Sequence, residues 1–143
     1  MSALRITHTL RAEDLTLVHE YLHAQAYWSR GIPLATLREA IAHSLCFAGL
    51  RDETLVAFAR VISDYATFAN LVDVFVLPAQ RGQGLARELM QAVLAHPKLQ
   101  GLRRFTLATA DAHGLYSKFG FEPLARPERF MERYDPGVYE RAP

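Results

Sequence analysis

The sequence lacks the features that would mark a secreted, membrane-spanning or nucleic-acid-binding protein. Its single cysteine, Cys46, cannot form a disulfide within the chain and suits a reducing compartment. The 16 Lys and Arg residues nearly balance the 15 Asp and Glu residues, so no strongly basic face favours nucleic acid. No apolar run approaches the roughly 18 residues of a membrane span, and the first residues lack the pattern of a secretory signal. These absences predict a cytoplasmic protein that binds neither nucleic acid nor membrane.

What the sequence does have is the composition of a globular protein. Half of its 143 residues are hydrophobic and 22% are charged. At this length, the composition predicts one domain that spans residues 1–143. Cys46 lies in the apolar run 45–48 and is expected to be a buried core thiol.

Strand-like and helix-like patterns alternate along the chain and predict a mixed α/β (α+β) fold. Apolar or alternating runs predict strands at 4–8, 44–50, 54–62, 71–77, 103–109, 121–124 and 129–134. Helical spacing predicts helices at 13–26, 34–45, 85–95 and 111–119. The second and third strands flank a short turn and are expected to form a hairpin. Thr36 and Glu39 have the spacing of a capping box.

Residues 70–90 have the pattern of a strand, a sharp turn and a helix. Pro78 ends the strand because proline donates no ladder hydrogen bond. Gly82 and Gly84 stand where the helix begins. A helix start has unpaired N–H groups and a partial positive charge, and glycine lets a large anion approach the backbone. Since Arg81 adds a guanidinium suited to phosphate, the turn is predicted to bind an anion.

Two phosphate-binding motifs with the same design do not fit this turn. The P-loop ends in Gly-Lys-Ser/Thr, whereas Leu85 and Ala86 follow Gly84 here. The dinucleotide fingerprint needs a third glycine, where Arg87 stands. It also needs an acidic residue about 20 positions further on, where this chain has two arginines.

The run Arg81-Gly82-Gln83-Gly84-Leu85-Ala86 resembles, position by position, the Arg/Gln-x-x-Gly-x-Gly/Ala motif of the GNAT N-acetyltransferases. A second run, Leu115-Tyr116-Ser117-Lys118-Phe119-Gly120-Phe121, resembles the family segment Leu-Tyr-x-x-x-Gly-Phe. The resemblance implies a mixed, mostly antiparallel sheet flanked by helices, whose central strand splays from its parallel neighbour at 103–109. It also implies acetyl-CoA as cosubstrate without a metal, and an amine of a small molecule or peptide as acceptor; a homodimer is left open.

The same resemblance implies roles for individual residues. Main-chain groups of the central strand would bond the pantetheine and polarise the thioester carbonyl, and the turn would hold the phosphates. The implied cofactor-binding residues are Val74, Phe75, Val76, Arg81, Gly82, Gln83, Gly84, Leu85, Ala86 and Arg87. Tyr116 would protonate the departing CoA thiolate.

The position of Tyr116 on its predicted helix supports that role. Ala112, Leu115 and Phe119 form an apolar stripe, and Tyr116 lies one residue, about 100°, off it. Seven residues earlier, where the family often has asparagine, this chain has Thr109.

The general base and the acceptor site are less defined. Asp73, Asp64 or a water chain could accept the proton of the amine. Tyr27 and Trp28, in the loop between the first two predicted helices, are expected to line the acceptor site. No feature of the sequence identifies the acceptor itself.

Two other functions remain open. A non-catalytic acyl-CoA sensor would use the same cofactor-binding residues. A zinc hydrolase would use His19, Glu20 and His23, which form a His-Glu-x-x-His motif on a predicted helix. The extended motif is absent because Ala26 and Ser29 occupy its Gly and His positions, so an exposed helix face is the simpler interpretation and no metal is expected.

Overall fold

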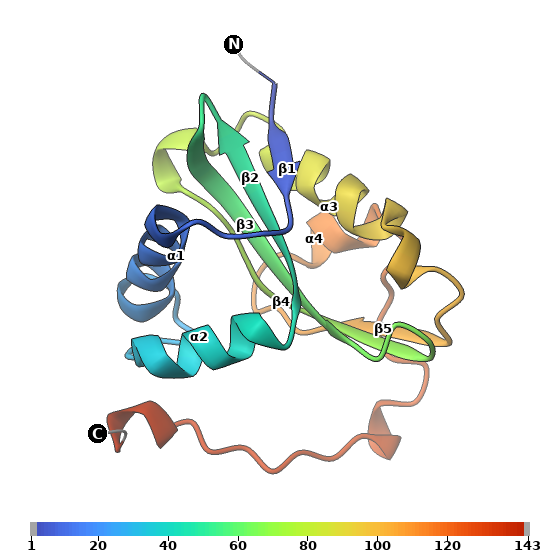
Figure 1. The fold of residues 1–143 in the computed structure, drawn as a ribbon. Coiled ribbons are helices and arrows are strands. Elements are labelled where there is room, and N and C mark those ends of the chain that lie inside the picture. Colours follow the sequence, from blue (N-terminus) through green and yellow to red (C-terminus); the bar gives the residue numbers. More distant parts are fainter. Residues whose placement is uncertain (1–2, 142–143) are drawn as a thin grey trace. The chain divides into compact units, whose positions relative to one another are not determined.

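The computed structural model describes residues 3–141 as two compact units, one ending at Ala108 and one beginning at Thr109. In order, the first unit contains β1 (Arg5–Thr7), α1 (Ala12–Ala24), α2 (Leu34–Ala42), β2 (Leu45–Arg51), β3 (Thr54–Ser63), β4 (Phe68–Val76), α3 (Leu85–Ala95) and β5 (Arg104–Leu107) (Figure 1). The second contains α4 (His113–Ser117). Short 3-10 turns lie at Pro78–Gln80, Pro97–Leu99, Pro127–Arg129 and Val138–Glu140.

The strands of the first unit form one five-stranded sheet in the order β1-β2-β3-β4-β5. The first four are antiparallel to their neighbours, and β5 runs parallel to β4. The turn between β2 and β3 has positive φ at both Asp52 (51°) and Glu53 (62°), as a type I′ hairpin turn requires. The predicted mixed, mostly antiparallel sheet and its hairpin are thus confirmed.

Helices cover both faces of this sheet. On one face, Tyr21 of α1 stacks on Phe75 of β4 with ring centroids 4.1 Å apart, and Phe75 in turn lies 5.8 Å from Phe58 of β3. On the other face, Phe47 of β2 contacts the ring of His96, the residue that ends α3. Phe47 and Phe58 are next to each other in the ladder but one step out of phase, so they point to opposite faces. The sheet therefore lies between α1 and α3 (Figure 1).

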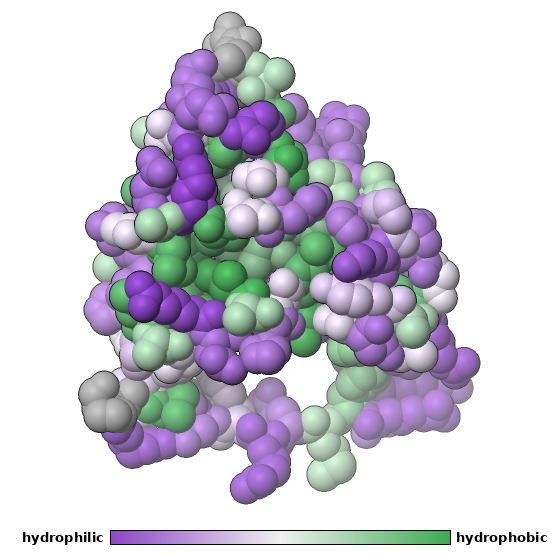
Figure 2. Space-filling view, viewed as in Figure 1, coloured by the Kyte–Doolittle hydropathy of each residue, from purple (hydrophilic) through white to green (hydrophobic). Residues whose placement is uncertain are grey.

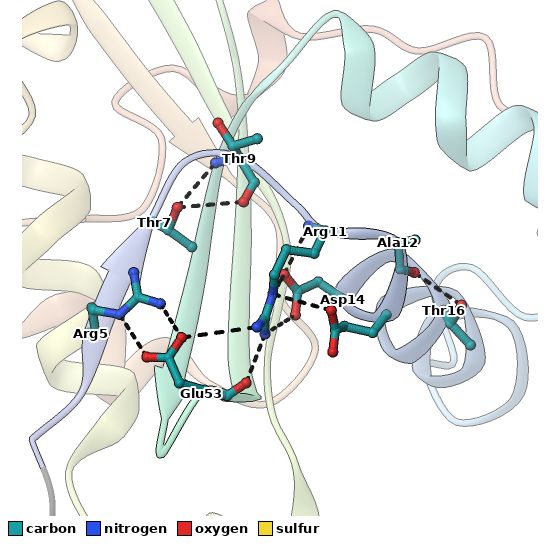
Figure 3. Close-up of polar contacts among 9 residues, drawn as sticks. Arg5, Thr7, Thr9, Arg11, Ala12, Asp14, Thr16 and Glu53 are labelled. Atoms are coloured by element: carbon teal, nitrogen blue, oxygen red, sulfur yellow. Dashed lines mark hydrogen bonds and ion pairs between the residues drawn. The ribbon is translucent and has the colours of Figure 1, made fainter.

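A polar network fixes the start of α1 to the β2–β3 turn (Figure 3). Arg11, the N-cap of α1, donates to the fully buried Asp14 through its backbone N–H (2.9 Å) and its guanidinium (2.9 and 3.0 Å). The same guanidinium donates to the Glu53 carbonyl at 2.8 Å, and Arg5 pairs with the Glu53 carboxylate at 2.8 Å. The hydrogen bonds from Arg11 lower the pKa of Asp14.

Cys46 is the buried core thiol that the sequence predicted. It is 2% exposed, and burial raises the pKa of the thiol to about 11. A protonated thiol of this kind is a poor nucleophile. Among residues 3–141, no helix is long and apolar enough to cross a membrane.

Three expectations about local structure are wrong. The N-cap of α2 is Pro33, with no side-chain cap, and Glu39 instead bonds His43 four residues on, at 3.0 Å. Residues 121–124 and 129–134 form no strand. Every side chain from 122 to 136 is exposed, with Met131 98% exposed. This stretch also contains three prolines, which cannot donate to a ladder.

Candidate functional site

The site begins where β4 parts from β5. Phe68 to Leu71 pair with Arg104 to Leu107, and β4 then continues to Val76 with no further β5 partner in the described sheet. This is the separation of parallel strands that the sequence resemblance predicted. Among residues 3–141, the second half of β4 therefore has one edge with no strand partner, called its free edge below.

A β-bulge in β4 lies just beyond the last paired residue. The ladder to β3 shifts register there, so that Asp73 and Val74 together face Ala59. Asp73 has a φ of 55°, the left-handed value of the first residue in a G1-type bulge. Aspartate is one of the few residues besides glycine that tolerate it. Since a bulge bends the strand that carries it, Asp73 gives a physical reason for the separation from β5.

Alternation along β4 decides which peptide groups reach the free edge. The N–H of Leu77 donates to the Val56 carbonyl of β3 at 2.9 Å. Because peptide groups alternate between the two edges of a strand, those of Phe75 also face β3. Those of Val74 and Val76 face the free edge instead.

The glycine turn follows directly. Gly82 and Gly84 both have a φ of 79°, and Gly84 is the N-cap of α3. A Cβ at either position would meet nothing within 4 Å, so backbone conformation and not crowding requires glycine there. Within residues 3–141, the N–H groups of 82–87 have no hydrogen-bond partner. Free N–H groups at the positive end of a helix suit an anion.

Two arginines hold this turn in place. Arg81 donates from Nε to the Val76 carbonyl (3.0 Å) and from Nη2 to the Tyr21 hydroxyl (2.8 Å), which joins the turn to β4 and α1. Arg51, at the end of β2, donates from Nη1 to the side-chain oxygens of Gln83 (2.6 Å) and Gln80 (3.2 Å). Arg51 lies outside the glycine motif, and no local pattern marked it in the sequence.

The Asp73 carboxylate joins β4 to the loop between α1 and α2. It is 8% exposed and accepts from Trp28 Nε1 and Arg60 Nε, both at 2.9 Å. Trp28 is 42% exposed and packs edge-to-face with the exposed Tyr27, with centroids 5.1 Å apart. The structure thus brings the two residues expected at the acceptor site next to the bulge.

A recess lies on the same face of the sheet. It has a volume of about 600 Å³ and lies between α2 and β3, with Glu39, His43, Ser44 and Arg60 among its lining residues. Figure 2 shows hydrophobic side chains gathered over the middle of the sheet, beside α1 and α2, with hydrophilic side chains around them. Arg60 lines this recess and also donates to Asp73, so its side chain connects the recess to the bulge.

Both carboxylates considered as general base make several hydrogen bonds. Asp73 has the two donors just described. Asp64 accepts from the hydroxyl of Thr67 (2.6 Å) and from the backbone N–H groups of Ala66, Thr67 and Phe68 (2.9, 2.7 and 3.2 Å). These bonds, the Thr67 hydroxyl first, lower the pKa of Asp64 well below its usual range. Asp64 is therefore a weak base that orders the turn before β4.

Tyr116 belongs to the second compact unit, from Thr109 onward. It is 8% exposed and is the most buried residue of α4, so Tyr116, and not the predicted apolar stripe beside it, is the residue that this helix buries most. Its ring packs edge-to-face with Phe121, with centroids 6.2 Å apart. Thr109 accepts the N–H of Ala112 at 3.1 Å, in the turn before α4, which begins two residues later than predicted, at His113.

The histidine pair of α1 has another partner. His19 donates from Nε2 and His23 from Nδ1 to the same Ile32 carbonyl, at 2.9 and 3.1 Å. Glu20 is exposed. Among the residues described, no three His, Cys, Asp or Glu side chains are grouped to hold a metal ion. The pair serves to fix the loop after α1.

Comparison with known proteins gives consistent matches. The model of the acetyltransferase (GNAT) family matches residues 13–121. A solved structure from Xanthomonas campestris pv. campestris, assigned to the same family, is 55% identical with a TM-score of 0.93, over 97% of this chain and 98% of that one. A structure of a predicted acetyltransferase with acetyl-CoA from Clostridium acetobutylicum shares the fold (TM-score 0.67, 14% identity, 94% of this chain and 96% of that one).

Curated relatives agree. An uncharacterized N-acetyltransferase, ycf52-like, from Prochlorococcus marinus is 32% identical over 103 residues, which is 68% of this chain and 56% of that protein. An acetyltransferase homologue of Gibberella zeae, FG08082, is 30% identical over 113 residues, or 64% of this chain and 63% of that protein. The chain thus spans less than two thirds of the length of these relatives.

Proposed function

The chain belongs to the GNAT family of acetyltransferases, and on this basis we propose that it transfers the acetyl group of acetyl-CoA to a primary amine of a small molecule or peptide. The observation that carries the proposal is that two sets of free main-chain groups follow each other along the chain. One is the pair of N–H groups of Val74 and Val76, on the edge of β4 where Arg81 takes only the Val76 carbonyl, and the other is the row of N–H groups at 82–87.

The residues present fit acetyl-CoA. The N–H groups of 82–87, at the start of α3, bind the pyrophosphate. Gly82 and Gly84 keep side chains out of the approach. Arg81 and Arg51 hold the turn and add positive charge beside it. The free edge of β4 binds the extended pantetheine as a neighbouring strand would.

The same edge supplies the chemistry. Acetyl-CoA brings an activated thioester, whose carbonyl oxygen gains negative charge when an amine attacks. A fixed N–H on Val74 or Val76 donates to that oxygen, and one such donor is worth about 3 kcal/mol in comparable enzymes. Tyr116 donates a proton to the departing thiolate, whose pKa is near 8.5 by analogy with cysteine. Since Asp73 and Asp64 are both engaged, water accepts the proton of the amine.

The acceptor enters on the face that carries α1 and α2. Tyr27 and Trp28 present exposed rings there, beside the bulge of β4. The recess over Arg60 offers apolar walls together with the carboxylate of Glu39, which attracts a cationic amine.

An acceptor screen tests the proposal. Purified protein is incubated with acetyl-CoA and a panel of alkylamines, diamines, amino acids and lysine peptides, and free CoA is measured with a thiol reagent. We expect at least one amine to raise CoA release above the amine-free rate, with an acetylated product by mass spectrometry. Binding of acetyl-CoA without release by any amine would instead indicate a non-catalytic sensor.

A further inference from the structure

Asp73 is held in a conformation that its strand does not favour. Non-glycine residues with positive φ also occur at Asp52, Glu53 and Tyr65, but these lie in turns. Among the residues described, Asp73 is the one such residue that is both buried and inside a strand. A left-handed backbone conformation costs free energy in a non-glycine residue, and it persists only where surrounding contacts offset that cost.

Those contacts come from two other parts of the fold, one of which is itself held by a third. Trp28, between α1 and α2, holds one oxygen of the Asp73 carboxylate, and Arg60 of β3 holds the other. Arg60 also donates to the hydroxyl of Ser44 at 3.0 Å, and Ser44 donates to the Ala40 carbonyl of α2 at 2.6 Å. With both oxygens occupied, Asp73 is an anchor and is poorly placed to accept a substrate proton.

We propose that Asp73 is a positioning residue for acetyl transfer, which fixes the bulge of β4 through Trp28 and Arg60. The inference rests on the proposed function. If the anchor is lost, the bulge can relax and the ladder shifts by one residue. Peptide groups alternate between the edges, so the N–H groups of Val74 and Val76 would then turn toward β3. The thioester carbonyl would lose its donor, whereas the glycine turn would still hold the phosphates.

Three variants distinguish the effect of the hydrogen bonds to Asp73 from the ability of the residue at position 73 to adopt a positive φ. Asp73→Gly accepts the left-handed φ but removes both anchors. Asp73→Asn tolerates the same φ and can still accept from Trp28, but its amide nitrogen cannot accept from Arg60. Trp28→Phe removes one donor and keeps an aromatic ring. The matched control is Asp14→Asn, which also removes a buried carboxylate from an arginine, at the start of α1 and away from β4.

Two measurements on the full chain need no acceptor. Calorimetry compares the affinities for CoA and acetyl-CoA, and infrared spectroscopy follows the carbonyl stretch of bound acetyl-CoA labelled with carbon-13. In the wild type, the N–H donor should lower this frequency and favour acetyl-CoA over CoA. Both Asp73 variants should lose that preference and the shift, with CoA affinity nearly unchanged. Trp28→Phe should lose part of the shift, and Asp14→Asn none. With an identified acceptor, turnover of the Asp73 variants should fall roughly 10²-fold.

Several results would overturn the inference. One is a wild-type carbonyl shift in Asp73→Gly, which would mean that backbone tolerance alone suffices. Another is an equal loss in Asp14→Asn, which would mean general destabilisation. If neither Asp73 variant folds, an unchanged shift in Trp28→Phe decides against the inference. A wild-type protein that binds neither CoA nor acetyl-CoA would instead refute the proposed function, and with it the basis of this inference.

Discussion

Replacing Gly84 with alanine should separate the backbone cost of the turn from its role in binding. Gly84 has a φ of 79°, and its new Cβ would meet nothing within 4 Å. The loss of stability is therefore the left-handed penalty alone, about 1–2 kcal/mol. For a chain of this size, that corresponds to a fall in the melting temperature of roughly 3–8 °C. The Cβ also stands beside the N–H groups that we assign to the pyrophosphate, so CoA should bind at least about tenfold more weakly, or about 1.4 kcal/mol.

Gly101 offers a matched control. It has a φ of 72° and equally open surroundings, but it lies in the turn before β5. Gly101→Ala should lose similar stability and keep wild-type affinity for CoA. Circular dichroism melts give the stabilities, and calorimetric titration with CoA gives the affinities. Wild-type affinity in Gly84→Ala, or an equal loss in both variants, would refute the assignment of the phosphates to this turn.

Three further predictions concern residues outside the turn. Tyr116→Phe should lower turnover by roughly 10²–10⁴-fold with little change in acetyl-CoA affinity; full turnover in steady-state assays would mean that solvent protonates the thiolate. Purified protein should carry no stoichiometric zinc by elemental analysis; one zinc per chain that is lost in His23→Ala would favour a hydrolase. Asp64→Asn should lower the melting temperature at pH 7. The folded-state pKa of Asp64 is lowered, so the ionised carboxylate stabilises the fold above the unfolded-state pKa, and this stabilisation is lost as the pH falls. The difference in melting temperature between wild type and Asp64→Asn should therefore narrow below about pH 4. A difference that stays constant down to pH 2 would contradict this role.

The sequence predicted the parts of the fold that depend on local pattern. Alternation and apolar runs located all five strands of the sheet, and the positive φ values of Gly82 and Gly84 agree with a sharp turn before a helix. The prediction of strands failed where a strand-like run has no neighbouring strand to pair with. The run 129–134 contains aromatic and apolar residues, but it forms no strand and its side chains are exposed.

The site was only partly predictable for the same reason. A bulge is a mismatch in register between two strands, so it could not be predicted from the residues around Asp73 alone. Arg51 donates to Gln83, which lies 32 positions further along the chain, and a local sequence motif cannot predict such a contact. In α4, which is only five residues long, periodicity could not define a buried face, and Tyr116 proved to be its most buried residue. The catalytic role of Tyr116 stays a prediction.

Calorimetric titration of the wild-type protein with acetyl-CoA tests the central claim most directly. We expect saturable binding of one acetyl-CoA per chain, through the free N–H groups of the glycine turn and the free edge of β4. CoA should bind at the same site and compete with it. Absence of binding for both acetyl-CoA and CoA at millimolar concentration would show that this turn and strand edge are not an acetyl-CoA site.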